Sequence, residues 1–359
     1  MAKIRVLVVE DSRTVRARLV EVLSDDPEIE VVGEASDGKT AIDLCQSIRP
    51  DVITLDMMLP VMTGLAATEY IMAHCPTPIL IVSASTNRGE LFRTYEALAA
   101  GAVDVLEKPT GEGIDGAWER KLVSTVKLVS RIKVITHVRA KLRASGAAGA
   151  PATWEPEPRP GPPRCQVVAI GASTGGPAAV VEVLRALPPA FPLPILLVIH
   201  IGEPFATAFA DWLDGVSRLR VAYAKDGDAL PPTGRAQVIM APPDRHLVVR
   251  GGRLRLTGDP ERHSCRPSVD ELFESLAREL GDRCAACLLT GMGKDGAAGL
   301  LAVKRAGGTT IAQDEATSVV FGMPREAILL GAAERVLPLG DIAPALSALS
   351  RGSPARRPA

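Results

Sequence analysis

The chain has 359 residues, 47% of them hydrophobic, and its charges nearly cancel at a net charge of −1. This composition excludes a wholly disordered chain and a protein that binds nucleic acid through bulk positive charge. No apolar run reaches the roughly 18 residues needed to span a bilayer, and residues 1–5 lack the layout of a signal peptide. We therefore expect a cytoplasmic protein of two ordinary domains, with no nucleic-acid partner and no insertion into a membrane.

Residues 1–125 alternate between short β-branched runs and segments with helical periodicity. This alternation predicts an α/β domain, a doubly wound parallel sheet with helices on both faces. In such a sheet, ligands bind at the carboxyl ends of the strands. The predicted strands are Ile4–Val9, a run that begins at Val31, Val52–Leu55, Ile79–Val82 and Val103–Leu106, with predicted helices over Thr14–Leu23 and Ala41–Ser47.

Residues 126–164 separate this domain from a second one. Lys121–Leu142 is typical of a mostly helical, basic connector, and the segment from there to residue 164 is rich in alanine and proline. Proline disfavours a helix or a central strand, so we expect a semi-stiff linker. The second domain is expected over residues 165–350, and residues 351–359 are expected to be a disordered tail.

A second doubly wound α/β pattern begins at Gln166, and it includes one predicted hairpin around Gly251-Gly252. The predicted strands are Val167–Ile170, Ile195–Ile199, Val238–Ala241, Ala285–Leu289 and Thr309–Ala312, the hairpin strands are 247–249 and 254–256, and the predicted helices are Pro177–Leu187, Phe205–Leu213, Val269–Leu280, Gly299–Ala306 and Arg325–Leu330.

Six cysteines are scattered along the chain, with one close pair, Cys284 and Cys287. A redox or zinc role for this pair would need a second pair, or histidines at ligand spacing, and neither is present. The pair leads into an apolar run, so we interpret these residues as buried, reduced thiols.

Polar side chains stand at the ends of the predicted strands of the first domain. Glu10 and Asp11 follow the first strand, Asp56 follows the third, Ser83 ends the fourth, and Lys108 follows the fifth. Three neighbouring carboxylates repel one another unless a cation lies between them, and Mg²⁺ prefers such oxygen ligands. The pattern predicts a Mg²⁺ site at Glu10, Asp11 and Asp56. Asp56 would accept a phosphoryl group that Ser83 and Lys108 contact.

These residues closely resemble the response-regulator receiver domain, a flavodoxin-like fold, over about residues 1–125. The resemblance rests on 10–12, 56–60, Gly64, Ser83 and 108–109. It implies that a partner histidine kinase phosphorylates Asp56, with Mg²⁺ held by Asp11, Asp56 and Glu10. One departure is Val105, where the family usually has an aromatic residue, so the usual aromatic switch is not expected.

The run Gly171–Gly176 lies between a predicted strand and a predicted helix, and its glycines permit a tight turn that lifts Ser173 above the sheet. The turn fits a serine nucleophile. It could instead cradle a dinucleotide phosphate, although the Gly-x-Gly-x-x-Gly pattern is absent.

A serine nucleophile needs a histidine base and an acid that orients the base. Among His200, His246 and His263, we favour His200, because it ends the strand that follows the serine's helix. The backbone N–H groups of Thr174, Met292 and Gly293 are candidate oxyanion donors. The acid stays open on the residues alone, the candidates being Asp295, Asp226, Asp244, Asp270 and Asp314.

The order Ser-His-Asp differs from that of α/β-hydrolases. Residues 165–348 instead resemble the Rossmann-like catalytic domain of the chemotaxis protein-glutamate methylesterases, through the runs 171–177, 241–247, 266–270, 289–297 and 312–327. The resemblance implies Ser173 as nucleophile, His200 as base and Asp295 as its orienting acid, with no cofactor at this site. It also implies that the substrate is a glutamyl γ-methyl ester on the cytoplasmic helices of chemoreceptors, with glutamine deamidation as a second activity.

Two departures from that family stand near the site. The segment around the base reads Ile199-His200-Ile201-Gly202, and Lys294 precedes the acid where asparagine is common. We hypothesise a phosphorylation-controlled methylesterase in which the unphosphorylated receiver covers the Ser173 site. The alternatives are a signalling adaptor with a decayed esterase site and a DNA-binding response regulator, for which no basic helix-turn-helix is visible.

Overall fold

The computed structural model describes residues 3–84, 87–108, 116–132 and 165–350. They belong to two compact units, Met1–Gly149 and Ala150–Ala359. Most of the expected connector, the linker and the expected tail lie outside the described residues. No helix among the described residues combines the length and the apolar character that crossing a membrane requires.

The first unit contains a five-stranded parallel sheet in the order β2-β1-β3-β4-β5. Helices α1 and α5 pack together, as do α2 with α3 and α3 with α4. The strands are β1 (Ile4–Val9), β2 (Ile29–Ala35), β3 (Val52–Leu55), β4 (Ile79–Ser83) and β5 (Asp104–Glu107), and the helices are α1 (Arg13–Ser24), α2 (Gly38–Ile48), α3 (Gly64–His74), α4 (Arg88–Ala99) and α5 (Ala117–Val129).

Side-chain caps determine where the helices of the first unit begin. Ser12, Asp37, Thr63 and Asn87 each accept a hydrogen bond from a backbone N–H in the first turn of the following helix. Because α1 begins only after the Ser12 cap, two acidic residues are left in the short loop between β1 and the helix. The fold therefore presents these acids at the carboxyl edge of the sheet.

The second unit contains a seven-stranded parallel sheet in the order β14-β13-β12-β6-β7-β9-β8 and a separate antiparallel hairpin of β10 and β11. The strands are β6 (Val167–Ala172), β7 (Ile195–Ile199), β8 (Arg220–Tyr223), β9 (Gln237–Met240), β10 (His246–Arg250), β11 (Arg253–Thr257), β12 (Cys284–Leu288), β13 (Thr309–Gln313) and β14 (Arg335–Leu337). The helices are α7 (Gly176–Ala186), α8 (Phe209–Val216), α9 (Val269–Leu280), α10 (Ala297–Arg305), α11 (Met323–Leu329) and α12 (Leu339–Leu349), with a 3₁₀ turn over Gly281–Arg283.

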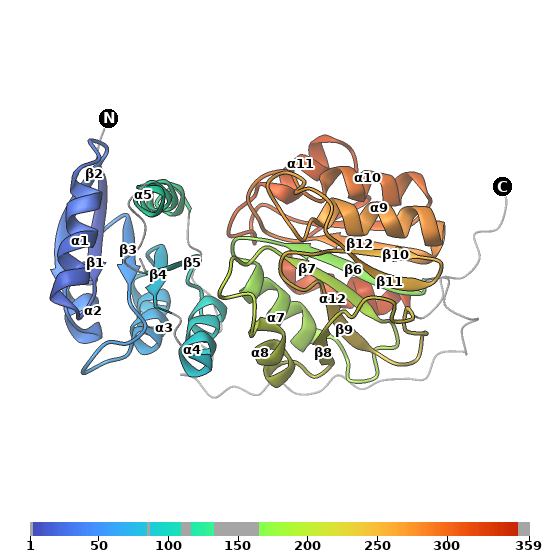
Figure 1. Cartoon of the computed structure of the whole chain (residues 1–359), viewed down its shortest axis with the longest axis horizontal. Helices are drawn as coiled ribbons and strands as arrows, with labels where there is room; N and C mark the ends of the chain where they lie inside the picture. The colour runs from blue at the N-terminus through green and yellow to red at the C-terminus, as the bar shows by residue number, and fades with distance from the viewer. Residues whose placement is uncertain (1–2, 85–86, 109–115, 133–164, 351–359) are drawn as a thin grey trace. The chain divides into compact units, whose positions relative to one another are not determined.

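Helices cover both faces of the larger sheet (Figure 1). α9, α10 and α11 lie on one face, and α7 and α12 lie on the other. The hairpin packs against α9, and one continuous apolar core joins its strands to α9, α10 and the central strands. The predicted fold class, two doubly wound parallel-sheet domains, is confirmed.

Most predicted elements of the second unit are present within a few residues, and α8 is the clearest difference. The sequence predicted a helix over Phe205–Leu213, but the helix begins at Phe209 and the preceding residues form turns. Phe205 is nevertheless buried, so the core contact that suggested a helix is made by a turn. Cys284 and Cys287 lie buried on β12 as free thiols, as expected.

Close packing of α9 against β6 places the start of α9 beside the end of β6. A Cβ atom added at Gly171 would overlap the side chain of Val269, the first residue of α9. Only glycine therefore allows this approach, which sets the distance between the two elements.

We expect Gly171→Ala to destabilise the second unit by about 1–3 kcal/mol, because the added methyl group forces the helix away from the sheet. Calorimetric unfolding of the full chain measures this effect. Gly340→Ala is the matched control, since Gly340 lies in α12 with open space around its Cβ position. Equal stability of the two variants would show that the contact is not restrictive.

Candidate active site

Ser173, His200 and Asp295 follow three neighbouring strands. β6 lies between β12 and β7 in the sheet, and Ala172 pairs with Ile199 in register. The N–H of His200 donates to the carbonyl of Ala172 at 3.0 Å, so Ser173 and His200 leave adjacent strands at the same level. Parallel strand ends thus bring together residues that are far apart in the sequence.

The turn at Ser173 depends on glycine at two positions. Gly175 has a φ of 75°, and a Cβ atom there would lie 2.5 Å from Val319 Cβ. A Cβ at Gly291 would lie 2.8 Å from Ser173 Cβ. α7 begins at Gly176, so its N-terminus lies directly after the serine and favours negative charge there.

Asp295 is buried, with 2% of its surface exposed, and five protein donors surround its carboxylate. Ser268 Oγ and the N–H of Val269 donate to it at 2.7 Å each, and the N–H of Asp270 donates at 3.1 Å. The N–H of Gly296 also donates at 3.1 Å, and His200 Nε2 is the fifth donor, at 2.9 Å from Asp295 Oδ2. Burial opposes ionisation, but these donors outweigh it and lower the pKa of Asp295.

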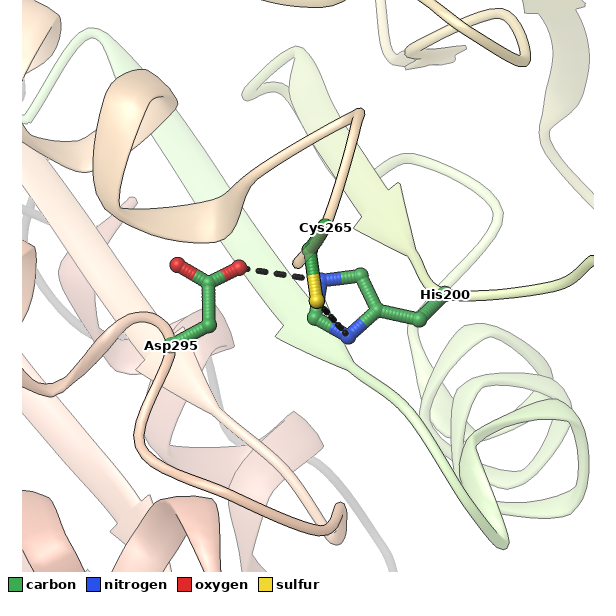
Figure 2. A group of neighbouring side chains, drawn as sticks. All are labelled: His200, Cys265 and Asp295. Atoms are coloured by element: carbon green, nitrogen blue, oxygen red, sulfur yellow. Dashed lines mark hydrogen bonds and ion pairs between the residues drawn. The ribbon is translucent and has the colours of Figure 1, made fainter. Parts of the chain in front are cut away.

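The imidazole of His200 lies between Asp295 and Cys265 (Figure 2). Its Nε2 faces Asp295, and its Nδ1 lies 3.7 Å from Cys265 Sγ. Burial alone would lower the pKa of His200, but the hydrogen bonds to Asp295 and Cys265 outweigh it and raise the pKa to about 9. The Nδ1 atom is therefore the one left to exchange a proton with a nucleophile.

Ser173 is close to this pair in the fold without being bonded to it. Among the described residues, the Ser173 hydroxyl has no hydrogen-bond partner, and the sulfur of Cys265 is the polar side-chain atom at His200 Nδ1. Catalytic hydrogen bonds are often open in substrate-free enzymes and tighten in the complex. Proton transfer requires Ser173 Oγ to approach His200 Nδ1.

Cys265 was not singled out by the sequence. It lies in the loop between β11 and α9, directly before Arg266-Pro267. The only sequence signal for a role of this cysteine was its position beside a run that resembles the methylesterases. Nothing in the sequence indicated that Cys265 lies against His200. Ser268, which supports Asp295 and caps α9, was missed for the same reason.

The competing histidines and acids have other partners. His246 Nδ1 accepts from the N–H of Ser268, and His263 pairs with Asp270 at 3.2 Å. Arg266 binds Asp244. Asp226 and Asp314 accept hydrogen bonds from residues other than His200. The structure thus pairs His200 with Asp295 and with none of the other four candidate acids.

The three candidate oxyanion donors lie in the loops around Ser173. Among the described residues, the backbone N–H groups of Thr174, Met292 and Gly293 have no carbonyl acceptor, whereas that of Gly291 donates to Val320. Met292 is 54% exposed. Lys294 points to solvent. Free N–H groups at this edge can hold a developing negative charge.

The first unit has a charged cluster at the corresponding edge of its own sheet. Lys108 Nζ lies 2.8 Å from Glu10 Oε2 and 3.0 Å from Asp56 Oδ2, and both carboxylates are buried. Burial and the neighbouring Asp56 raise the pKa of Glu10 against the opposing effect of Lys108. Burial opposes the charge of Lys108, but the two carboxylates raise its pKa.

Oxygen atoms of Glu10, Asp11 and Asp56 lie within 4.8 Å of one another, so this cluster can hold a metal ion. Three carboxylate oxygens are the ligands that a hard divalent cation takes. Ser83 Oγ, also at this edge, is buried and has no hydrogen-bond partner among the described residues, which leaves it available to an added ligand. Val105 packs against the apolar core of the unit.

We expect the imidazole of His200 to hold its second proton more tightly than an ordinary histidine and to lose it as the pH rises through about 9, which gives the neutral ring that can act as a base. Asp295→Asn should lower this pKa, because it removes the negative charge that stabilises the imidazolium. Nitrogen-detected NMR of labelled histidine in metal-free buffer measures the titration of His200 in the parent chain and in the Asp295→Asn variant. Asp341→Asn, at an exposed acid of α12, is the control and should leave the titration unchanged. Titration of His200 near pH 6.5 in the parent chain would contradict the expectation.

Comparison with known proteins identifies both units. The CheB methylesterase family model matches residues 168–346, and the response regulator receiver domain model matches residues 6–113. Protein-glutamate methylesterase/protein-glutamine glutaminase 2 of Anaeromyxobacter dehalogenans is 45% identical over 97% of this chain and 97% of its own length. The protein of the same name from Pseudomonas aeruginosa is 44% identical over 98% of both chains.

Among solved structures, the Thermotoga maritima CheB methylesterase catalytic domain is 39% identical, with a TM-score of 0.48, and the match covers 52% of this chain and 98% of that one. The similarity to the curated relatives extends through both units and confirms both resemblances that the sequence suggested. The chain belongs to the family of protein-glutamate methylesterases that carry a response-regulator receiver domain.

Proposed function

We propose that this protein hydrolyses glutamyl γ-methyl esters on the cytoplasmic helices of chemoreceptors, and that phosphorylation of Asp56 activates it. The observation that carries the catalytic part is the 2.9 Å hydrogen bond between His200 and the buried Asp295, at the strand edge where Ser173 emerges. An orienting acid, a base and a hydroxyl in this order are what acyl transfer requires.

Ser173 is the nucleophile of the proposed reaction. Its Oγ attacks the ester carbonyl carbon while its proton passes to His200 Nδ1. Asp295 holds the other ring nitrogen and stabilises the imidazolium that forms. The carbonyl oxygen, now negatively charged, is received by the N–H groups of Thr174, Met292 and Gly293. The N-terminus of α7 adds a favourable field at the same position.

Collapse of the tetrahedral intermediate releases the leaving group. The bond to the methoxy oxygen breaks, and methanol departs with the proton that His200 held. Water then attacks the acyl-enzyme while His200 accepts its proton, and His200 passes this proton to Ser173 Oγ as the bond to the acyl carbon breaks and glutamate is released. With a glutamine side chain, the same steps release ammonia, which accounts for deamidation as a second activity.

The first unit supplies the control. Glu10, Asp11 and Asp56 would hold Mg²⁺, which when bound neutralises charge on the phosphoryl oxygens. Lys108 lies within 3.0 Å of Asp56 and can contact an oxygen of the phosphoryl group, as can the Ser83 hydroxyl. A histidine kinase is the proposed donor. Phosphorylation adds charge beside Lys108 and shifts the population toward the form in which the Ser173 site is open to its substrate.

Ser173→Ala should reduce methanol release from a methylated receptor fragment by at least about a thousandfold, because no other hydroxyl takes its place. The assay quantifies methanol at equal enzyme concentration, with circular dichroism as the folding control. Ser217→Ala, at the C-terminal cap of α8, is the matched substitution and should remain active. Undiminished release by Ser173→Ala would refute the nucleophile, and no release by the parent chain would favour the adaptor alternative.

Asp56→Asn should abolish phosphoryl uptake from acetyl phosphate and the stimulation of methanol release by this donor. The amide is a poor nucleophile, and it removes a ligand of the proposed metal site. Radiolabel incorporation and the rate ratio with and without donor are the two measurements. Asp43→Asn, at an exposed acid of α2, is the control and should label normally. Normal labelling of Asp56→Asn would overturn the assignment of the acceptor.

A further inference from the structure

A thiol lies against the nitrogen through which His200 must act. We propose that a thiophilic divalent cation, zinc, binds between Cys265 Sγ and His200 Nδ1 and switches the esterase off. Ligand atoms of His200, Cys265 and Asp295 all lie within 4.8 Å of one another. The inhibitory effect rests on the proposed function, whereas the binding of the cation does not.

The distance between the two ligand atoms fits tetrahedral zinc. Bonds of about 2.3 Å to sulfur and about 2.0 Å to nitrogen, at a tetrahedral angle, separate the two atoms by roughly 3.5 Å. Cys265 Sγ and His200 Nδ1 are 3.7 Å apart. The spacing of these two ligand atoms therefore needs to change little when the cation binds, and water is expected at the remaining positions.

Asp295 prepares the imidazole for this role. Its carboxylate accepts from His200 Nε2, so the proton of a neutral ring resides on Nε2 and the lone pair on Nδ1 faces Cys265. A carboxylate that holds the remote nitrogen of a ligand histidine is a recurrent arrangement in zinc sites, where it fixes the ring and raises its basicity. The pair of Asp295 and His200 thus provides one of the two proposed ligands, His200 Nδ1, already oriented toward Cys265.

The loop that carries Cys265 is held on both sides. Arg262 binds Glu271 at 3.1 Å and Glu274 at 2.7 Å, both on α9, and its backbone pairs with that of Cys265. Arg266 binds Asp244 at 2.7 Å. These anchors determine where the thiol lies, so little conformational entropy is lost when it binds a cation.

Binding consumes the lone pair that catalysis needs. The Cys265 thiol releases its proton to solvent and binds as a thiolate, while His200 binds as the neutral ring with its proton on Nε2. With Nδ1 bound to the cation, the proton of Ser173 has no acceptor, and attack on the ester stops. Removal of the cation by a chelator restores the base.

Other clusters of ligating residues in the described chain fit zinc less well. Glu10, Asp11 and Asp56 offer oxygen alone, which suits a hard cation. His263 and Asp270 pair with each other, and Arg262 lies 3.5 Å from the same carboxylate. Cys45 and Cys75 lie 3.6 Å apart at their sulfur atoms, but Cys45 is buried, and burial and the neighbouring Cys45 raise the pKa of Cys75 to about 12. This disfavours the thiolates that zinc needs, so Cys75→Ser serves as the control.

The binding test adds Co²⁺, a spectroscopic substitute for zinc, to the reduced, chelator-treated full chain. We expect a thiolate-to-cobalt charge-transfer band in the near ultraviolet, lost on addition of zinc. Cys265→Ser and Cys265→Ala should lose the band, and Cys75→Ser should keep it. Ser173→Ala should also keep it, which separates this inference from the nucleophile assignment. No band in the parent chain, or a band lost in Cys75→Ser and kept in both Cys265 variants, overturns the proposal.

The inhibition test measures methanol release against free zinc, with each variant normalised to its own rate in chelator. Cys265→Ser should raise the zinc concentration for half-inhibition by at least about tenfold, the loss expected when a ligand is removed. Cys75→Ser should match the parent, and a chelator should restore the parent's rate. Equal sensitivity of the Cys265 variants and the parent would overturn the inhibitory role.

Discussion

The buried hydrogen bond between Asp295 and His200 is the interaction on which the second unit's site depends. A carboxylate that is 2% exposed is costly to bury unless donors surround it. The fold supplies them from the start of α9, through Ser268 and Val269, and from the end of β7, through His200. Removing any of these donors would leave the buried charge of Asp295 partly unpaired. The carboxylate therefore holds together the loops that also position the nucleophile.

The two units stabilise buried charge in different ways, and the difference matches their proposed roles. Asp295 receives fixed donors from the backbone, from the Ser268 hydroxyl and from His200, and it stays an acceptor throughout the proposed reaction. Asp56 is neutralised by Lys108, a flexible ammonium that it shares with Glu10. Such a partner can move to contact an added phosphoryl group, which leaves Asp56 able to react.

The strands at the centre of each sheet were predictable because they are continuous apolar runs. β1, β3 and β7 begin and end where the sequence placed them. The edge strands β8 and β14 went unpredicted, since they are short, partly exposed and without a distinct pattern. The late start of α8 has a similar cause, because burial of Phe205 alone does not distinguish a helix from a turn.

The sequence by itself determined that Ser173 and His200 end successive buried strands, and the parallel topology made their meeting foreseeable. It left five acids as partners for the base, and it did not mark Cys265. Only the tertiary structure decided those points, because the acid and the thiol arrive on loops whose paths depend on the packing of α9 and on the anchors of Arg262 and Arg266. Local pattern reports which face of an element is buried, whereas contacts between distant loops depend on the packing of the whole core.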